Sequence, residues 1–521
     1  MRRFFETRYA LWLALPMGAV LSLAFAPFEW WPLAILCLAY LFAAWQYAPP
    51  RLAAKFGFLF TAGIFLAGTY WLYNTIHEIG HAPAWIAIFL MFGMVAIIGG
   101  YCGLLGHAIG RWLNPSTPGP SGNRASLLFL LLVLPAAWTL LEWFRGWFLS
   151  GFPWFALGYS QTDTPLAGFA PVGGVYTISL LVAISAGALV ALLGGSSRQR
   201  LVAAITIVAI WGSGAVLWKH EWTRPVNGPL TVAVVQGAVP QDVKWSEEYR
   251  DSTLKLYRDL TLPHLGSDII LWPEAALPDM PEQLRDYLSF MWSAARAKNS
   301  TLITGLLHYG ENESDVRNGL LSLDKDLQWY DKRRLVPFGE FFPVPAFVRE
   351  WMRLQSLPYS DITPGARHQS ALHAAGQRIG ATICYEDAYG SEQLEVLKEA
   401  TLLVNVTNDA WFGDTTAAPQ HLQISRMRVM EAERPLLRAA NDGISAIIDA
   451  SGKVEKTLPR FKPGVLTGSV QPRTGLTPYA HVGNWPLVSF CMAILVLALW
   501  PAIASLQRAG RLRVKSATAQ K

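Results

Sequence analysis

Residues 378–387 read Arg-Ile-Gly-Ala-Thr-Ile-Cys-Tyr-Glu-Asp, an apolar run that ends in a polar turn. The pattern predicts a buried strand whose last side chain, that of Cys384, meets the turn. A cysteine at a strand end is in a position suited to nucleophilic chemistry. The other cysteines lie inside long hydrophobic stretches, where a thiol is usually a small apolar filler: Cys37, Cys102 and Cys491.

The composition of the chain is that of a membrane protein. Of its 521 residues, 52% are hydrophobic and 15% are charged, and 22 are tryptophan. A helix that spans a bilayer needs about 20 mostly apolar residues. Such stretches recur at roughly 10–28, 31–48, 56–75, 84–108, 126–144, 172–194, 201–218 and 486–505. We therefore expect an α-helical transmembrane bundle of eight spans, seven before a soluble block and one after it.

Basic residues set the expected orientation of these spans. They gather before the first span, in alternate loops and after the last span, at Arg2, Arg3, Arg8, Arg51, Lys55, Arg111, Arg124, Arg198, Arg200, Arg508, Arg511, Arg513 and Lys515. The positive-inside rule then places both termini in the cytoplasm and the block 219–484 on the far side of a bacterial inner membrane. The net charge of +6 follows largely from these loops, so nucleic acid is not an expected partner.

The expected compartment bears on the state of the thiol. The far side of a bacterial inner membrane is oxidising. Cys384 is the one cysteine in the sequence of the block 219–484, so it has no partner there for an internal disulfide. This favours a free, reactive thiol.

Within the block the pattern changes to short apolar runs separated by turn residues. Runs typical of buried strands lie at 230–237, 268–272, 301–307, 319–323, 377–384 and 401–406. Helical spacing occurs at 246–260, 281–298 and 420–440, and a closing hairpin is expected from 444–449 and 454–458. Strands that alternate with helices predict an α/β domain with a substantial buried sheet.

Three polar residues follow predicted strands in this block: Glu274, Lys332 and Cys384. Taken singly, a glutamate in such a position is more often a turn residue, a lysine a surface charge, and a cysteine an inert thiol. Only the combination of the three favours catalysis. A thiol is a few per cent ionised at neutral pH, so a nucleophilic cysteine needs a nearby base or cation. Glu274 can accept the thiol proton, and Lys332 can balance negative charge on sulfur and then on a substrate oxygen. The backbone N–H of Tyr385 follows the nucleophile and is a natural second oxyanion donor.

Four motifs in the block resemble the nitrilase (carbon–nitrogen hydrolase) superfamily. They are Trp-Pro-Glu274, Lys332-x-x-Leu-Val-Pro-Phe-Gly-Glu340, Cys384-Tyr-Glu386 and Asn408-Asp-Ala-Trp-Phe-Gly413. An eight-span chain that carries such a block resembles, over nearly its whole length, the apolipoprotein N-acyltransferase family. The resemblance implies spans 1–7 within 1–222, a periplasmic nitrilase-like αββα sandwich at 223–472, and the last span with a cytoplasmic tail at 473–521.

The same resemblance implies acyl transfer through a thioester. Carried over by motif, Cys384 is the nucleophile, Glu274 the general base and acid, and Lys332 the cation that stabilises the oxyanion. Matching positions imply that Glu340, Tyr385 and Glu386 support the active site and that Trp245 and Trp411 lie near the acyl-chain entrance. The implied donor is a phospholipid, with phosphatidylethanolamine expected. The implied acceptor is the α-amino group of a diacylglyceryl-cysteine at an apolipoprotein N-terminus, and no cofactor is expected.

A helical pattern lies between the lysine and cysteine motifs, at residues 343–357. Phe347, Trp351 and Leu354 recur there at helical spacing, with charged residues elsewhere on the turn. We interpret the segment as a short interfacial helix that gates the site, with Trp351 in contact with substrate. A helix packed in the core explains the same spacing.

Three other interpretations stay open. His77-Glu-Ile-Gly-His81 matches the zinc motif of metalloproteases, although Gly80 and Pro83 disfavour the helix that this motif needs. A membrane-tethered amidase would keep the catalytic residues but would need one anchor rather than a bundle of spans. A transporter or receptor should carry intramembrane charges, for which Glu142 is the candidate, and it leaves the catalytic residues unexplained.

Overall fold

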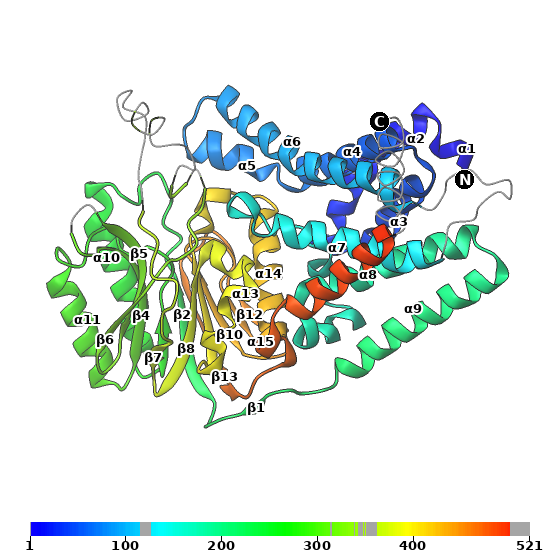
Figure 1. The fold of residues 1–521 in the computed structure, drawn as a ribbon. Coiled ribbons are helices and arrows are strands. Elements are labelled where there is room, and N and C mark those ends of the chain that lie inside the picture. Colours follow the sequence, from blue (N-terminus) through cyan, green and yellow to red (C-terminus); the bar gives the residue numbers. More distant parts are fainter. Residues whose placement is uncertain are drawn as a thin grey trace, which may run out of the picture. The chain divides into compact units, whose positions relative to one another are not determined.

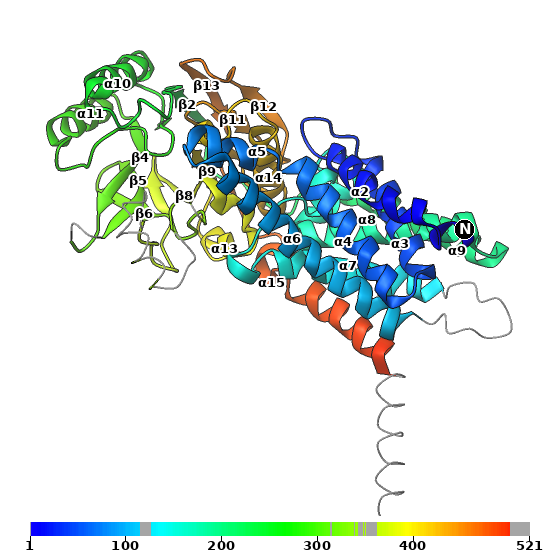
Figure 2. The same ribbon diagram turned by 90° about the horizontal axis from the view of Figure 1, so that it is seen from above.

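The computed structural model describes residues 2–114, 127–312, 315–337, 339–341, 347, 350 and 362–500. The chain divides into two compact units, which are drawn in Figures 1 and 2. The helical unit comprises Met1–Tyr70, Ala84–His220 and Asn484–Lys521, and the α/β unit comprises Trp71–Pro83 and Glu221–Gly483. The short segment Trp71–Pro83 thus belongs to the α/β unit although helices of the other unit flank it in sequence.

The helical unit is built from apolar helices. They are α1 (Arg2–Phe5), α2 (Arg8–Leu21), α3 (Pro32–Tyr47), α4 (Pro50–Gly68), α6 (Ala84–Ala108), α7 (Leu134–Arg145), α8 (Ala170–Gly194), α9 (Ser197–Leu217) and a last helix at Trp485–Trp500. Among the described residues, four helical stretches are long and apolar enough to cross a membrane: Pro50–Gly68, Ala84–Leu113, Pro165–Gly194 and Ser197–Leu217. Three shorter apolar helices accompany them, so several apolar helices are present but the expected eight spans are not confirmed.

Local geometry shortens some of the expected spans. The apolar stretch 10–28 forms a helix only as far as Ala24, and the chain then turns at Pro27. In the stretch 126–144, a π-helical turn, Phe129–Val133, runs directly into α7, so the helix changes type there without a break. Apolar composition alone does not report such features, because a proline or a change of helix type leaves the mean hydropathy high.

Close backbone approach joins α2 to α4. A Cβ atom at Gly18 would overlap the carbonyl oxygen of Phe60, and one at Gly63 would overlap that of Leu15. Small residues at such crossings let apolar helices pack by close van der Waals contact where the hydrophobic effect contributes little. The two glycines therefore fix this crossing.

The α/β unit contains two six-stranded sheets. The first has the order β13-β2-β3-β4-β5-β6 and the second has the order β12-β11-β10-β9-β8-β7. The strands of the first are β2 (Leu230–Gln236), β3 (Ile269–Leu271), β4 (Thr301–Tyr309), β5 (Val316–Leu323), β6 (Leu327–Asp331) and β13 (Gly464–Val470). Those of the second are β7 (Leu372–Ala374), β8 (Gln377–Ile383), β9 (Leu402–Thr407), β10 (Leu436–Ala440), β11 (Ala446–Ile448) and β12 (Val454–Thr457). A small ribbon pairs β1 (Arg224–Pro225) with β14 (Arg473–Thr474) where the chain enters and leaves the unit.

Helices cover the outer faces of the two sheets (Figure 1). The helices of this unit are α5 (Trp71–Tyr73), α10 (Glu247–Thr261), α11 (Arg285–Ala297), α13 (Gly390–Gln393), α14 (Ala417–Ala432) and α15 (Pro478–Val482). One apolar cluster joins the first sheet to α10 and α11, and another joins the second sheet to α14 and α15. The layers are therefore helix, sheet, sheet and helix.

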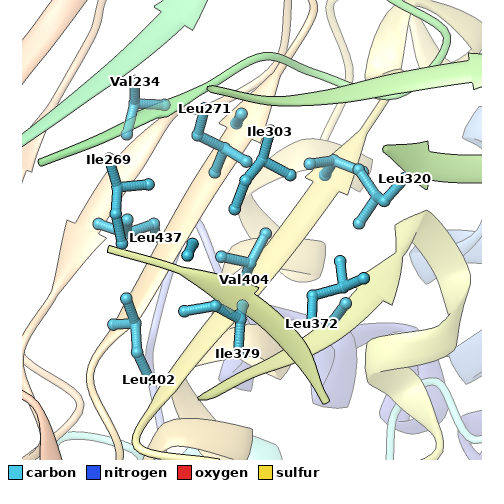
Figure 3. Close-up of a cluster of buried hydrophobic side chains, with 14 of the residues drawn as sticks. Val234, Ile269, Leu271, Ile303, Leu320, Leu372, Ile379, Leu402, Val404 and Leu437 are labelled. Carbon is cyan, nitrogen blue, oxygen red and sulfur yellow. The ribbon is translucent and has the colours of Figure 1, made fainter. Parts of the chain in front are cut away.

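The core lies between the two sheets (Figure 3). In β2, Val232 and Val234 face this core, while Ala233 and Val235 face the helices. This alternation follows from the two-residue period of a strand, and it requires apolar residues on both faces because both are covered. The central strands therefore read as continuous apolar runs.

One predicted helix is wrong in part. The stretch 420–440 was expected to be helical throughout, but α14 ends at Ala432 and residues 436–440 form the buried strand β10, parallel to β9. The chain reverses at Glu433, whose φ is +45°, and Pro435 lacks the N–H that would continue the helix. The other predicted strands and helices of the block are present, with ends that differ by a few residues, except that most of the segment 343–357 lies outside the described residues.

Replacing Leu402 with alanine tests the core between the sheets. Leu402 is fully buried there, so its truncation should lower the free energy of unfolding by about 2–5 kcal/mol. Thermal unfolding of the detergent-solubilised chain measures the loss. The matched control is Leu327→Ala, on a side chain that is 52% exposed in β6, which should leave the transition nearly unchanged. Equal losses in both variants would contradict this description of the core.

Candidate active site

Three strands deliver the residues of the candidate site. Glu274 follows β3, Lys332 directly follows β6, and Cys384 directly follows β8. The strand β6 is antiparallel to β5, which is antiparallel to β4, so β6 runs in the same direction as β3 and β4. Glu274 and Lys332 therefore leave the first sheet at the same edge, while Cys384 comes from the second sheet.

The Glu274 carboxylate is buried and held by three donors. Its Oε1 accepts from Lys332 Nζ at 3.1 Å and from Asn318 Nδ2 at 2.7 Å. Its Oε2 accepts from the backbone N–H of Asn408 at 2.8 Å. Three donors on a carboxylate that is 6% exposed satisfy its oxygens and fix its orientation.

The Lys332 ammonium lies between two carboxylates. Besides Glu274 it contacts Glu340 Oε1 at 2.8 Å, and the other oxygen of Glu340 accepts from the N–H of Val336, also at 2.8 Å. Burial disfavours the ammonium, but attraction to the two carboxylates and to Cys384 outweighs it and holds the pKa of Lys332 well above its usual value. The site therefore keeps one permanent positive charge.

Cys384 occupies a strained position. Its φ of +51° lies in the left-handed region, which a residue with a Cβ rarely adopts. Its carbonyl oxygen lies 3.4 Å from Asn405 Nδ2 and 3.2 Å from the ring of His421. Burial, and then the charge of Glu274, raise the pKa of the Cys384 thiol, while Lys332 lowers it. The resting thiol is therefore neutral, and the charges of Glu274 and Lys332 both act on it.

Glu386 ties the end of β8 to the segment that carries the lysine. Its Oε2 accepts from the Tyr330 hydroxyl at 2.9 Å and from the N–H of Ile383 at 2.8 Å, and its Oε1 accepts from the N–H of Arg333 at 2.6 Å. Burial raises the pKa of Glu386, against the nearby charge of Arg333. Glu386 thus positions the residues on either side of the site.

A buried cluster of charged side chains contacts the backbone carbonyl of Cys384. His421 Nε2 is 2.9 Å from Asp387 Oδ1, its Nδ1 is 3.2 Å from Asp409 Oδ1, and Arg438 Nη2 is 3.2 Å from Asp409 Oδ2. Burial and Arg438 disfavour the imidazolium, but the two carboxylates outweigh them and raise the pKa of His421 to about 9. Two cations then balance two anions, which a buried cluster needs. The cluster gives the turn at Cys384 a rigid base.

The proposed substrate contacts are exposed where the structure describes them. Trp245 is 48% exposed and Trp411 is 40% exposed. Tyr385 is half-buried, and its ring packs edge-on against that of Tyr389 at 5.2 Å. Trp351 lies outside the described residues, as does most of the segment 343–357.

The zinc-motif histidines do not share a helix. His77 lies in a π-helical turn, Asn74–Ile79, and His81 lies beyond it with a φ of +52°. His77 Nδ1 is 2.8 Å from the carbonyl oxygen of Ala82. The zinc motif of metalloproteases requires both imidazoles on one helix face, so this geometry does not match it.

The segment that contains those histidines packs on the loop 408–413. The Trp71 indole N–H donates to Gln420 Oε1 at 3.2 Å, and its ring meets that of Phe412 edge-on at 5.0 Å. Trp71 is buried in this contact. The loop that supplies the Asn408 N–H to Glu274 is therefore supported from a distant part of the sequence.

Sequence reasoning missed several residues of the site. Asn318 lies within the apolar strand β5, Arg438 lies within the apolar strand β10, and His421 lies on α14. A charged or amide side chain inside an otherwise buried run was the available signal, because such a group needs a buried partner. The identity of that partner depends on the fold.

Comparisons with known proteins cover both units. Residues 17–188 match the family described as Apolipoprotein N-acyltransferase N-terminal domain, and residues 231–479 match Carbon-nitrogen hydrolase. An Apolipoprotein N-acyltransferase of Methylococcus capsulatus is 40% identical over 93% of this chain and 95% of its own length. A protein of the same name from Azotobacter vinelandii is 39% identical over 94% of each chain.

Two solved structures are similar to about half of this chain. A CN-hydrolase superfamily protein from Xanthomonas campestris has a TM-score of 0.35 and 19% identity, over 47% of this chain and 91% of its own. An amidase from Nesterenkonia sp. has a TM-score of 0.37 and 18% identity, over 50% of this chain and 97% of its own.

Replacing Asn318 with leucine should slow the reaction of the Cys384 thiol. Asn318 Nδ2 donates to Glu274 at 2.7 Å and to Glu340 at 3.2 Å, so its loss removes a donor that, like Lys332, is shared by both carboxylates. A hydrogen bond to a charged group contributes about 1.5–3 kcal/mol, which corresponds to roughly 10- to 100-fold in rate. Stopped-flow acylation by an activated ester measures the change.

The control for this variant is Asn312→Leu, in the exposed loop before β5. It should react at the wild-type rate. A normal rate in the Asn318 variant would show that the shared donor does not position the carboxylates.

Proposed function

This chain belongs to the apolipoprotein N-acyltransferase family, and from that membership we propose that Cys384, Glu274 and Lys332 carry its reaction. The chain is an acyltransferase of lipoprotein maturation, with a carbon–nitrogen hydrolase α/β unit and apolar helices typical of a membrane protein. Its substrates are a phospholipid, which donates a fatty acyl group, and a lipoprotein, which accepts it.

One observation supports the catalytic assignment above all. The Lys332 ammonium contacts Glu274 at 3.1 Å, and both charges act on the buried thiol of Cys384. A base that abstracts the thiol proton and a cation that balances the resulting negative charge are the two groups that a cysteine nucleophile needs. Glu340, Tyr385 and Glu386 are the proposed supporting residues.

The first half-reaction forms a thioester. Glu274 takes the proton of the Cys384 thiol as sulfur attacks the ester carbonyl of the phospholipid. Lys332 and the N–H of Tyr385 stabilise the tetrahedral oxyanion. The carbon–oxygen bond then breaks, Glu274 returns the proton to the departing oxygen, and the lysophospholipid leaves.

The second half-reaction forms an amide. The α-amino group of the diacylglyceryl-cysteine attacks the thioester carbonyl, and Glu274 takes a proton from the attacking nitrogen. The carbon–sulfur bond breaks, and Glu274 returns that proton to the sulfur of Cys384. Each half-reaction leaves Glu274 ionised, so the cycle closes as a ping-pong transfer with no net proton gained by the enzyme.

Phosphatidylethanolamine is the proposed donor among phospholipids, with Trp245, Trp351 and Trp411 as its proposed contacts. The exposure of Trp245 and Trp411 supports this role, since half-exposed aromatic rings suit a boundary between lipid and water. The helix-spaced segment around Trp351 is the proposed lid.

The proposed membrane arrangement has eight spans, with both termini in the cytoplasm and the α/β unit in the periplasm. The alternate placement of basic residues between the apolar helices supports this orientation. The proposed domains are 1–222, 223–472 and 473–521. An amidase function is not favoured, because it leaves the match over residues 17–188 without a role.

Intact mass spectrometry tests the thioester. Wild-type chain incubated with phosphatidylethanolamine in mixed micelles, without acceptor, should gain the mass of one fatty acyl group. Cys384→Ala should gain none, and the control Cys102→Ala, in which a helix-buried thiol is removed, should gain it normally. A lipopeptide with a free α-amine should discharge the adduct, whereas its N-acetylated form should not. An adduct that persists in Cys384→Ala would refute the assignment, and phosphatidylglycerol micelles test the headgroup.

Removing the cation should make the thiol harder to ionise. Burial raises the pKa of Cys384 and Lys332 opposes that rise, so Lys332→Met should raise the pKa further. The rate of alkylation by iodoacetamide at pH 8 should fall about 10-fold or more, with its midpoint moved to higher pH. Lys398→Met, on an exposed lysine, is the control. Alkylation as fast as in the wild type would mean that Lys332 does not act on the sulfur.

A further inference from the structure

A second buried lysine lies beside the proposed general base. Lys244 is 1% exposed, and its Nζ lies 3.4 Å from the backbone carbonyl oxygen of Glu274. Among the described residues, this long contact is the one hydrogen bond that the Lys244 ammonium makes. A buried ammonium with so little hydrogen bonding is costly unless nearby charges stabilise it. Its position therefore calls for a role.

The carbonyl that Lys244 meets has left the sheet ladder. Ala275, the next residue, has a φ of +44°, in the left-handed region. Gly305 of β4 packs so closely that a Cβ there would lie 2.7 Å from the Cα of Glu274 and 2.8 Å from the N of Ala275. The turn at Glu274 is thus strained and tightly packed on one side, with the Lys244 ammonium at its carbonyl.

The same loop reaches the other end of Glu274. Gln241 Oε1 accepts from Asn408 Nδ2 at 2.7 Å, and the backbone N–H of Asn408 donates to the Glu274 carboxylate. Asn441 Nδ2 adds a bond to Asn408 Oδ1 at 3.1 Å. The loop 241–244 therefore holds Glu274 directly through its backbone and indirectly through its carboxylate.

The charges around Lys244 are few and mostly acidic. Burial lowers the pKa of Lys244 to about 8, and attraction to Glu274 and Asp442 limits the decrease. Burial, followed by the charge of Asp409, raises the pKa of Asp442 to about 7, against Arg460 and Lys244. Glu274 and Asp442 are thus the two acids that act on this ammonium, while Lys332 contacts the Glu274 carboxylate itself at 3.1 Å.

We propose that Lys244 is a positioning residue for Glu274: the Lys244 ammonium holds the strained turn and places a positive charge near the carboxylate that abstracts the thiol proton. The inference rests on the proposed role of Glu274 as the general base. In this proposal two cations act on Glu274. Lys332 acts on the sulfur of Cys384 as well, whereas Lys244 is buried and acts only through Glu274.

Loss of this charge should appear in the pH profile. With methionine at position 244 the carboxylate of Glu274 loses a nearby cation, which disfavours negative charge on the proposed base. The acid limb of Cys384 acylation should then move to higher pH by about one unit. The rate on the acidic side of the wild-type limb should fall up to about 10-fold, and it should return on the plateau at higher pH. A purely structural role would lower the rate at every pH and leave the midpoint of the limb in place.

The experiment uses the full-length chain in detergent with 4-nitrophenyl octanoate as the acyl donor. The rate of adduct formation on Cys384 is measured from pH 5.5 to 8.5 for the wild type, Lys244→Met, Lys244→Arg and Asp442→Asn. Lys255→Met, on an exposed lysine of α10 that pairs with Asp259, is the control. The arginine variant keeps the charge and should keep the wild-type limb. Asp442→Asn removes the second acid that acts on Lys244, and it should not raise the midpoint of the acid limb.

The order of the midpoints decides the outcome. A midpoint in Lys244→Met above those of the wild type and of Asp442→Asn supports the proposal. A midpoint in Lys244→Met no higher than in Asp442→Asn overturns it. If Lys244→Met does not fold, the arginine variant decides, because a limb shifted to higher pH despite the retained charge also overturns it. Absence of any Cys384 adduct in the wild type would instead refute the proposed function.

Discussion

The buried ammonium of Lys332 must remain paired with carboxylates, and the rest of the site is arranged to meet that requirement. An isolated charge in such a setting would cost many kcal/mol, so Glu274 and Glu340 are held within about 3 Å of it. Those carboxylates in turn need donors, which Asn318 and the N–H of Asn408 supply. Strands from both sheets must therefore end at one place.

The same arrangement explains why the thiol can rest in its neutral form. Its pKa is raised by burial and by a neighbouring carboxylate, so negative charge on sulfur is disfavoured until a substrate carbonyl accepts it. Glu274 and Lys332, the proposed proton acceptor and cation, are already oriented by their contacts, and they need no rearrangement when charge moves in the proposed reaction. The strained turn at Cys384 is supported by the buried cluster of His421 and Arg438. It holds the sulfur in a fixed position relative to Glu274 and Lys332.

Glu274 and Cys384 could be placed at strand ends because each adjoins a short apolar run. Lys332 follows β6, which is not among the predicted apolar runs, and it was singled out by its motif. The partners that tune them could not be predicted. Asn318 and Lys244 meet Glu274 only after β5 and the loop 241–244 have been placed, and neither has a local sequence pattern. The run 436–440 illustrates the same limit, since a short apolar segment fits a helix or a buried strand and only its pairing with β9 decides. The count of eight spans is not confirmed for a related reason, because hydropathy does not report where a helix ends or changes type.

The contact of Trp71 with Gln420 has a consequence for biosynthesis. The two residues are 349 positions apart, and a ribosome that adds about 5–20 residues per second needs roughly 20–70 s to cover that interval. Trp71 is therefore synthesised long before the loop 408–413 that it supports. The contact cannot form until most of the chain has been made. The α/β unit can therefore be completed only late in synthesis. A fragment that begins at Glu221 would lack Trp71–Pro83, which belongs to the same unit.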